Sequence, residues 1–489
     1  MNFMSHHVLI INPWITDFSA YDFWLKPLGL LYVGGVLRQY GYHVSLIDCM
    51  DRYDPELLNF LGVASPRNQH FNTGKFHREI IPKPPLYNNI PRNFARYGFP
   101  LELFKAKLKG ILRPEVILVT SGMTYWYPGV QLAIEEIHKT FPDTPVVLGG
   151  IYPTLCRDHA VENSGTDFVI SGEGELAALQ LVDKLTGVKR DYDGFPNHID
   201  GFPYPVFDLY PNLAYASVMT SRGCPLRCTF CASNIVSGAY RWRTPRKVVD
   251  ELEYYYETLG IREFAFYDDA LLTNHKDHLA PILEQIIDKG WDASFHTPNG
   301  LQCKLIDDDI AARMFSSGFK TIRLSYESGN PDRQKDMSQK VSNETFARAV
   351  SCLYQASFEL GDLEAYVMAA LPGQTIEEVL WSMAYVHAQG VKIRLAAFSP
   401  IPGTVEWERA KLYHDFPEDA DPLLSNNTIL PIKPSGGTAE TFEKINRFAK
   451  HLNQQLMENL VETDVRSLVS RMKQNFSRLE LWGVSSCEV

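Results

Sequence analysis

Apolar residues along this chain recur at two spacings, and these spacings alternate. Short apolar runs rich in Val, Ile and Phe are typical of buried strands. The longer segments between them place an apolar residue at every third or fourth position, as amphipathic helices do. Glycine or proline commonly stands where one kind of segment ends and the other begins. This alternation of strand and helix predicts an α/β fold built on parallel sheets.

The most regular alternation lies in the middle of the chain and predicts a partial (β/α)6 barrel of the TIM type. Six predicted strands alternate with helices at similar spacing. Ligands of such folds lie at the carboxyl ends of the strands, so we expect the chemistry where each apolar run stops. The predicted strands are 216–220, 263–267, 293–296, 321–325, 365–370 and 394–398, and the predicted helices are 246–259, 278–289, 307–317, 344–358 and 376–388.

The first third of the chain predicts a separate, doubly wound Rossmann-like (flavodoxin-like) sheet of about five strands. Its strand ends carry glycine-rich loops, among them Ser121-Gly122 and Gly149-Gly150. No G-x-G-x-x-G motif follows the first strand, so the pattern does not favour a dinucleotide site. The predicted strands are 7–11, 44–47, 116–120, 146–148 and 168–170, and the predicted helices are 28–40, 130–138, 158–162 and 175–185.

Two segments depart from the alternation. An insertion at about residues 51–113 is rich in Pro, Asn, aromatic and basic residues. It fits either a solvated basic loop or a lid over an anionic substrate such as a phosphate or carboxylate. After residue 404 the pattern turns helical, with helices predicted at 440–457 and 461–474. We therefore expect three units, namely a Rossmann-like domain at 1–195, a partial barrel at 196–405 and a helical extension at 406–489.

Composition and charge exclude several classes of protein. The chain has 489 residues, of which 45% are hydrophobic and 21% charged, as in ordinary globular proteins rather than disordered ones. The sequence predicts neither a membrane-spanning helix nor a secretion signal, and we expect a cytoplasmic protein. The net charge of −11 argues against broad electrostatic attraction to nucleic acid.

Three of the eight cysteines lie within one short loop, as Cys224, Cys228 and Cys231. Gly223 and Pro225 can bend this loop so that the three thiolates converge on one metal centre. An iron–sulfur cube held by three thiolates leaves one iron open to another ligand, whereas structural zinc takes four protein ligands. A zinc knuckle that uses a distant fourth ligand is the alternative. The other five cysteines are expected to be small buried hydrophobes: Cys49, Cys156, Cys303, Cys352 and Cys487.

This C-x3-C-x2-C triad, with an aromatic residue before its last cysteine, resembles the cluster loop of the radical S-adenosylmethionine (SAM) superfamily. In that family a [4Fe-4S] cluster binds SAM and cleaves it to a 5′-deoxyadenosyl radical, which abstracts a hydrogen atom from the substrate. The later strand ends also resemble the family's SAM-binding segments. The resemblance implies that SAM contacts Phe230, Tyr267, Asp268, Ser325, Glu327 and Leu371.

The N-terminal third resembles the cobalamin (B12)-binding domain that precedes many radical SAM barrels. The matching segments are residues 27–32, the strand end at 148–150 with Pro153-Thr154, and residues 171–175. The D-x-H-x-x-G motif that supplies an axial histidine in many cobalamin domains is absent, so a domain that only packs on the barrel is the alternative. The resemblance implies cobalamin contacts from Asn12, Pro13, Trp14, Ser121, Gly122, Gly149, Gly150, Gly172 and Glu173.

Together these resemblances imply a radical SAM enzyme that performs cobalamin-dependent methylation of an unactivated carbon. Radical cyclisation or rearrangement without methyl transfer is one alternative, and a non-catalytic iron–sulfur or zinc-binding module is another. A tRNA-modifying role is disfavoured by the net charge and by the lack of a small basic β-domain. The expected partners are a small-molecule substrate and an electron donor such as flavodoxin or ferredoxin. On strand-end position alone, the substrate-facing candidates are His296, Asn299 and Tyr326.

Overall fold

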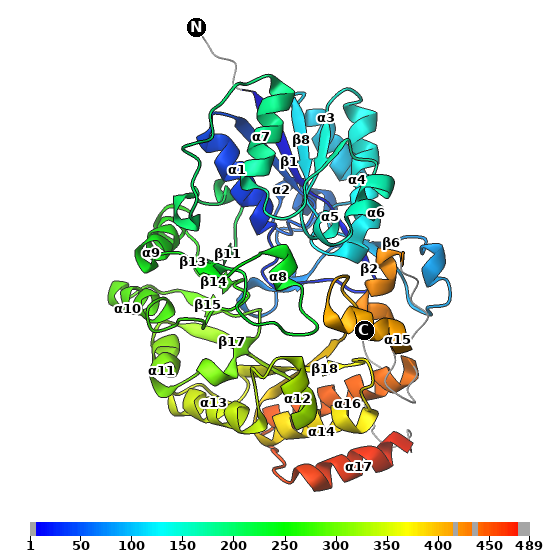
Figure 1. Ribbon diagram of the computed structural model, residues 1–489, viewed down its shortest axis with the longest axis vertical. Coiled ribbons are helices and arrows are strands. Elements are labelled where there is room, and N and C mark those ends of the chain that lie inside the picture. Colours follow the sequence, from blue (N-terminus) through cyan, green and yellow to red (C-terminus); the bar gives the residue numbers. More distant parts are fainter. Residues whose placement is uncertain (1–5, 414–418, 433–438, 478–489) are drawn as a thin grey trace.

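The computed structural model describes residues 6–413, 419–432 and 439–477. Its N-terminal part is a five-stranded parallel sheet in the order β10-β9-β8-β1-β4, with helices on both faces (Figure 1). The strand order reverses between β1 and β8, and α/β sheets bind ligands outside the carboxyl ends of the strands at such a point. The strands are β1 (His7–Asn12), β4 (His43–Asp48), β8 (Val116–Val119), β9 (Val146–Leu148) and β10 (Phe168–Val169).

The two faces of this sheet belong to two hydrophobic cores. Val8 and Ile10 of β1 pack on one side, whereas Leu9 and Ile11 pack on the other, because successive strand residues point to opposite faces. Both sets are fully buried, which explains the continuous apolar run that predicted the strand. The helices are α1 (Leu28–Gln39), α4 (Tyr127–Thr140), α5 (Ile151–Leu155), α6 (Arg157–Asn163) and α7 (Glu175–Thr186).

The middle of the chain forms the predicted partial barrel. Six parallel strands follow in the order β11-β14-β15-β17-β18-β19, and helices cover their outer face (Figure 1). The strands are β11 (Ala216–Val218), β14 (Glu263–Phe266), β15 (Ser294–His296), β17 (Phe319–Glu327), β18 (Leu363–Ala369) and β19 (Lys392–Ala397), with β16 (Leu301–Gln302) paired to β17. The helices are α9 (Pro245–Glu253), α10 (Leu279–Lys289), α11 (Asp308–Ser316), α12 (Pro331–Met337), α13 (Asn343–Gln355) and α14 (Ile376–Ala388).

A segment from the N-terminal part fills the inner face of the barrel. The indole of Trp24 stacks on His296, with ring centroids 4.1 Å apart. The ring of the neighbouring Phe23 lies against the guanidinium groups of Arg323 and Arg394, at 4.7 and 5.0 Å. The barrel interior is therefore packed at this level, and open space lies nearer the carboxyl ends of the strands.

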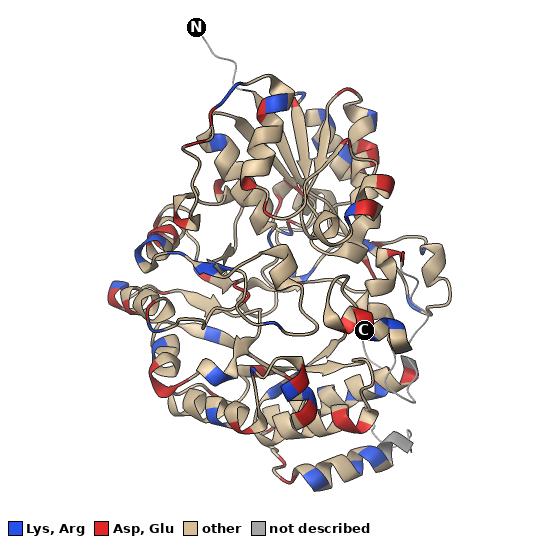
Figure 2. Cartoon of the chain, in the orientation of Figure 1, with Lys and Arg blue, Asp and Glu red and all other residues tan. Residues whose placement is uncertain are grey.

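The insertion at 51–113 is a folded element and not the solvated basic loop that the sequence allowed. Short antiparallel strands pair across long sequence distances, and several basic side chains form ion pairs, among them Arg96 with Glu79 and Lys107 with Asp54 at 3.0 Å. Basic and acidic residues are interspersed over the helices of the whole chain (Figure 2). The elements of the insertion are α2 (Pro55–Leu61), β5 (Gly74–Lys75), β6 (Arg78–Ile80), β7 (Ala95–Tyr97) and α3 (Leu101–Gly110). Two strands that precede the insertion pair with it, β2 (Ile15–Asp17) with β7 and β3 (Tyr21–Asp22) with β5.

The described part of the C-terminal extension contains three α-helices and a segment that returns to the N-terminal part. Within that segment Leu423 O accepts a hydrogen bond from the Tyr87 hydroxyl at 2.8 Å, and the Asn426 amide donates to Asp17 at 3.0 Å. Parts of the predicted extension, including Cys487, lie outside the described residues. None of the helices that the structure describes could cross a membrane. The helices are α15 (Val405–Tyr413), α16 (Ala439–Met457) and α17 (Val465–Ser477).

Candidate functional site

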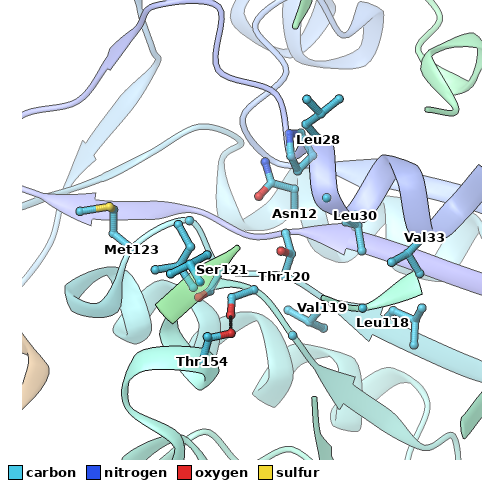
Figure 3. Close-up of a pocket in the computed structure, with 18 of the residues that line it drawn as sticks. Asn12, Leu28, Leu30, Val33, Leu118, Val119, Thr120, Ser121, Met123 and Thr154 are labelled. Atoms are coloured by element: carbon cyan, nitrogen blue, oxygen red, sulfur yellow. Dashed lines mark hydrogen bonds between the residues drawn. The ribbon is translucent and has the colours of Figure 1, made fainter. Parts of the chain in front are cut away.

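A cavity of about 580 Å³ lies at the carboxyl end of the N-terminal sheet, where the strand order reverses (Figure 3). Its wall continues onto the barrel through Met219, Tyr267 and Asn299. It also includes Val236 and Ser237, which follow the three clustered cysteines in the chain. One cavity therefore spans both sheets. All nine residues predicted to contact cobalamin line it: Asn12, Pro13, Trp14, Ser121, Gly122, Gly149, Gly150, Gly172 and Glu173.

The glycines of this wall bring backbone directly to the cavity surface. Gly150 has φ +98° and ψ −161°, a conformation that is essentially restricted to glycine. A methyl group on Gly150 would lie 2.5 Å from the carbonyl oxygen of Ser121, whereas one on Gly149 would meet no atom closer than 4.0 Å. The Thr154 hydroxyl donates to Gly150 O at 2.7 Å and accepts from the Gly172 amide at 2.9 Å. The two glycine loops are thus tied together around open space.

The rest of the cavity wall is mainly apolar and aromatic. The Asn12 amide faces the cavity and donates to Asp48 at 2.7 Å, while the buried Lys26 ammonium pairs with Asp51 at 3.1 Å. No histidine is among the lining residues of the described chain. The donor set therefore fits a large, mostly apolar cofactor that rests on glycine backbone. The apolar lining includes Leu28, Leu30, Val33, Leu118, Val119 and Met123, labelled in Figure 3.

The three clustered cysteines lie in a loop closed by two short antiparallel strands, β12 (Ser221–Arg222) and β13 (Arg241–Trp242). Gly223 has φ +76°, and a methyl group there would lie 2.8 Å from Gly238 O, so the start of the loop requires glycine. Thr229 anchors the loop: its amide donates to Met337 O at 2.9 Å and its hydroxyl to Glu406 at 2.8 Å. The short helix α8 (Ser233–Val236) follows the last cysteine.

Burial favours the protonated form of two of the three thiols, Cys224 and Cys228. Burial, with the other two cysteines adding, raises the pKa of Cys224 to about 11. Burial also raises the pKa of Cys228, although the Lys340 ammonium opposes the shift. Thiolates are the ligands, so cluster binding must release these protons. In the part of the chain that the structure describes, no three His, Cys, Asp or Glu side chains form a preassembled metal site.

Of the residues predicted to contact SAM, Phe230 lies in the cysteine loop, and the others lie at or just after the ends of β14, β17 and β18. Phe230 and Leu371 belong to one apolar cluster. The Glu327 carboxylate pairs with Lys340 at 2.8 Å, and the Lys340 ammonium lies 5.5 Å from the centre of the Phe230 ring. Although burial disfavours the charge on Lys340, the Glu327 carboxylate holds its pKa above the usual range. No sequence pattern selects Lys340, because it lies between α12 and α13 and belongs to no motif.

Asp268, which is predicted to contact SAM, and its neighbour Asp269 lie in different surroundings. The Asp268 carboxylate is buried and accepts hydrogen bonds from the Thr220 amide and hydroxyl and from the Ser221 hydroxyl, so it caps the end of β11. Asp269 is exposed and contributes to the electrostatic environment of Cys224.

The three substrate-facing candidates lie in different surroundings. His296 is fully buried under Trp24, and its ring lies 2.8 Å from the Glu263 carboxylate. Tyr326 is also fully buried, points into the core outside the barrel and donates to Asn343 at 2.7 Å. Only Asn299 lies on the cavity wall, and its amide donates to Tyr267 O at 3.0 Å.

Two family models match this chain, each on one side of the cavity. The model of the radical SAM superfamily matches residues 218–386, and the model of the B12 binding domain matches residues 106–182. The chain is therefore a radical SAM enzyme that carries a B12-binding domain, as the two resemblances in the sequence predicted. The enzymes of this superfamily use a [4Fe-4S] cluster and SAM.

Individual relatives share most of the length of the chain. It is 28% identical over 340 residues to an uncharacterized methyltransferase of Pyrococcus horikoshii, a match that covers 62% of this chain and 71% of that protein. It is 23% identical over 463 residues to the cytidylyl-2-hydroxyethylphosphonate methyltransferase of Streptomyces wedmorensis, covering 81% and 80%. The structure of the radical SAM methyltransferase TsrM from Kitasatospora setae, with cobalamin and a [4Fe-4S] cluster bound, has a TM-score of 0.59 at 18% identity, covering 84% and 75%. This likeness shows a shared fold.

Proposed function

We propose that this enzyme transfers a methyl group to an unactivated carbon of a small molecule, using cobalamin, SAM and a [4Fe-4S] cluster. The observation that carries the proposal is the single cavity, whose wall runs from the glycine loops of the B12-binding domain to the helix after Cys231. Relatives named methyltransferases support the same reaction. We further propose that an external donor such as flavodoxin or ferredoxin supplies the electron, in the reducing environment of the cytoplasm.

The residues would divide the work by position. Cys224, Cys228 and Cys231 would hold the cluster, and the glycine loops with residues 12–14 would hold cobalamin. SAM would lie between them, at the strand ends that carry Tyr267, Ser325 and Glu327, beside Phe230 and Leu371. The bound cofactors would supply the electron, the radical and the methyl group. The division of the chain near residues 195 and 405 follows this assignment.

The chain's own contribution is to keep water away from a reactive centre. Trp14, Trp126, Met219 and Leu25 line the space between the two sheets with apolar surface. Beneath them the barrel interior is filled at the level where the Trp24 indole stacks on the buried His296 ring. A carbon radical needs a closed site, because stray hydrogen donors that enter it would quench the radical.

A product assay with SAM tests the proposal without knowledge of the substrate. Protein with an anaerobically reconstituted cluster is incubated with SAM and titanium(III) citrate, with and without hydroxocobalamin. Mass spectrometry then quantifies 5′-deoxyadenosine and S-adenosylhomocysteine. We expect both products with hydroxocobalamin, and S-adenosylhomocysteine only when hydroxocobalamin is present, because it is the product of SAM that has lost its methyl group.

The other outcomes separate the alternatives. 5′-Deoxyadenosine without S-adenosylhomocysteine, in protein that retains cobalamin after desalting, would support radical cyclisation or rearrangement. One relative, 22% identical over 271 residues, is named an anaerobic magnesium-protoporphyrin IX monomethyl ester cyclase, in Synechocystis. Absence of both products with an intact cluster would contradict any radical SAM activity and support a non-catalytic iron–sulfur module.

A further inference from the structure

The loop that holds the three cysteines is attached at both ends to the wall of the cofactor cavity. Arg222 and Arg241 are opposite each other in the β12–β13 pair that closes this loop. Both arginines pair with the same oxygen of Glu173: Arg222 Nη1 lies 3.6 Å from Oε1, and Arg241 Nη2 is in direct contact with it. Glu173 lines the cavity, whereas Arg241 is not among the lining residues. One carboxylate therefore joins the cavity to the closed end of the cysteine loop.

Arg222 is held more firmly than Arg241. Its Nη2 donates to Glu175 at 2.5 Å, and the two side chains are only 8% and 5% exposed. Its guanidinium also lies 4.9 Å from the centre of the Tyr32 ring, on α1. Removing a partner from such a buried pair leaves a charge without compensation and destabilises the fold. The Arg222–Glu175 pair is therefore a fixed anchor between the cysteine loop and the start of α7.

Glu173 is the adjustable member of this contact. Its side chain is 42% exposed, so its ion pairs are weak in the absence of other constraints. It belongs to a loop with a left-handed residue, Gly172 at φ +79°, whose amide bonds to Thr154 on the neighbouring wall. A large cofactor seated against this loop would restrict its motion. It would also desolvate the carboxylate, and both effects strengthen the pairing with the two arginines.

We propose that Glu173 is a positioning residue that couples cobalamin binding to the arrangement of the cluster loop. A corrin against residues 172–174 fixes Glu173, which fixes the closed end of the loop that carries the cysteines. Because such coupling is reciprocal, an assembled cluster tightens cobalamin binding by the same factor. The inference rests on the cofactors of the proposed function, but not on methyl transfer.

The experiment compares cobalamin affinity with and without the cluster. Cluster-free protein and the same preparation after anaerobic reconstitution are titrated with hydroxocobalamin, and the absorption spectrum gives the two dissociation constants. For the wild-type chain we expect binding at least about fivefold tighter with the cluster, the lower end of typical allosteric coupling. In Glu173→Gln we expect this ratio to fall to about one.

Two further variants separate coupling from simple contact. Arg241→Gln removes the partner of Glu173 that lies outside the cavity, so the ratio of the two dissociation constants should again fall to about one. The double variant with Glu173→Gln should lose no more coupling than either single variant, since both substitutions break the same Glu173–Arg241 ion pair. Glu284→Gln is the matched control, because it breaks an exposed Glu–Arg pair between α10 and α11, on the outer helices of the barrel. It should keep the wild-type ratio.

Each result decides between the two proposals. A wild-type ratio of one, with cobalamin bound, would overturn the coupling and leave the proposed function standing. If Glu173→Gln weakens cobalamin binding equally with and without the cluster, the ratio is kept. Glu173 would then only contact cobalamin, and the coupling would be overturned. Failure of the wild-type chain to bind hydroxocobalamin in either state would overturn both the coupling and the proposed function.

Discussion

A methyl group added to either of two adjacent glycines on the cavity wall, Gly149 and Gly150, should affect different properties: stability at Gly150 and cobalamin binding at Gly149. In Gly150→Ala the methyl would meet Ser121 O at 2.5 Å, Ser121 N at 2.8 Å and the Thr120 hydroxyl at 2.9 Å. Two of these atoms are backbone, and the carbonyl is held by the Ile151 amide at 2.9 Å, so they cannot move aside cheaply. We therefore expect Gly150→Ala to damage the fold.

The magnitude follows from two costs. A residue other than glycine at φ +98° and ψ −161° costs on the order of 1–3 kcal/mol. The steric overlap with fixed backbone adds roughly 1–3 kcal/mol. Gly150→Ala should therefore lower the free energy of unfolding by about 4 kcal/mol, which corresponds to a melting temperature lower by roughly 10 °C. Urea denaturation followed by circular dichroism measures this change directly.

Gly149→Ala is the matched variant, because its methyl meets no atom within 4 Å other than Ile170 O at 4.0 Å. We expect its free energy of unfolding to stay within about 1 kcal/mol of the wild type. The methyl projects into the space assigned to cobalamin, so hydroxocobalamin should bind at least about tenfold more weakly, a loss of roughly 1.4 kcal/mol. Wild-type affinity in a normally folded Gly149→Ala, or wild-type stability in Gly150→Ala, would refute this account of the glycine wall.

Three further predictions follow from the site. Cys228→Ala should abolish the brown chromophore of the reconstituted cluster. Cys352→Ala should keep it, because Cys352 is buried on α13 and lies outside the cysteine loop. Absorption near 400 nm measures the chromophore in both variants. Burial, with Arg243 adding, lowers the pKa of His278 to about 4. As the pH falls from 6.5 towards 4, His278 becomes protonated in the unfolded chain but stays neutral in the folded chain. The free energy of unfolding should therefore fall by about 3 kcal/mol over that pH range. His278→Gln should flatten the fall in urea denaturation midpoints, and an unchanged slope would contradict the assignment. Tyr326→Phe should cost about 1 kcal/mol of stability, from its lost hydrogen bond, and leave hydroxocobalamin affinity unchanged; reduced affinity would restore Tyr326 to the cavity.

The sequence predicts most of the two sheets because their strands are buried on both faces. Such strands read as continuous apolar runs, and the run at 146–148 coincides with β9 (Val146–Leu148). The short strands of the insertion carry no comparable signal. Ile15 pairs with Tyr97, and each strand has only two or three residues, so the pairing depends on tertiary contacts that no local pattern records.

The candidate site is predictable where its chemistry is local in the sequence. Cysteine spacing and glycine loops are such signals, and the glycine-loop residues line one cavity. Side-chain direction is not local, because a shift of one position along a strand exchanges the inner and outer faces. Tyr326 therefore points into the core although it stands beside Glu327, and Trp24 covers His296 from more than 250 residues away in the sequence.

The central claim is that cobalamin and the cluster bind close to each other, at opposite ends of one cavity. The most direct measurement is low-temperature electron paramagnetic resonance of protein loaded with one cobalamin and one cluster per chain, both reduced to their paramagnetic forms. The account predicts a cob(II)alamin signal broadened by magnetic interaction with the reduced cluster, and a narrow signal in the cluster-free Cys228→Ala variant. Identical, unbroadened signals in the two proteins, with both cofactors bound in the wild type, would contradict the shared cavity.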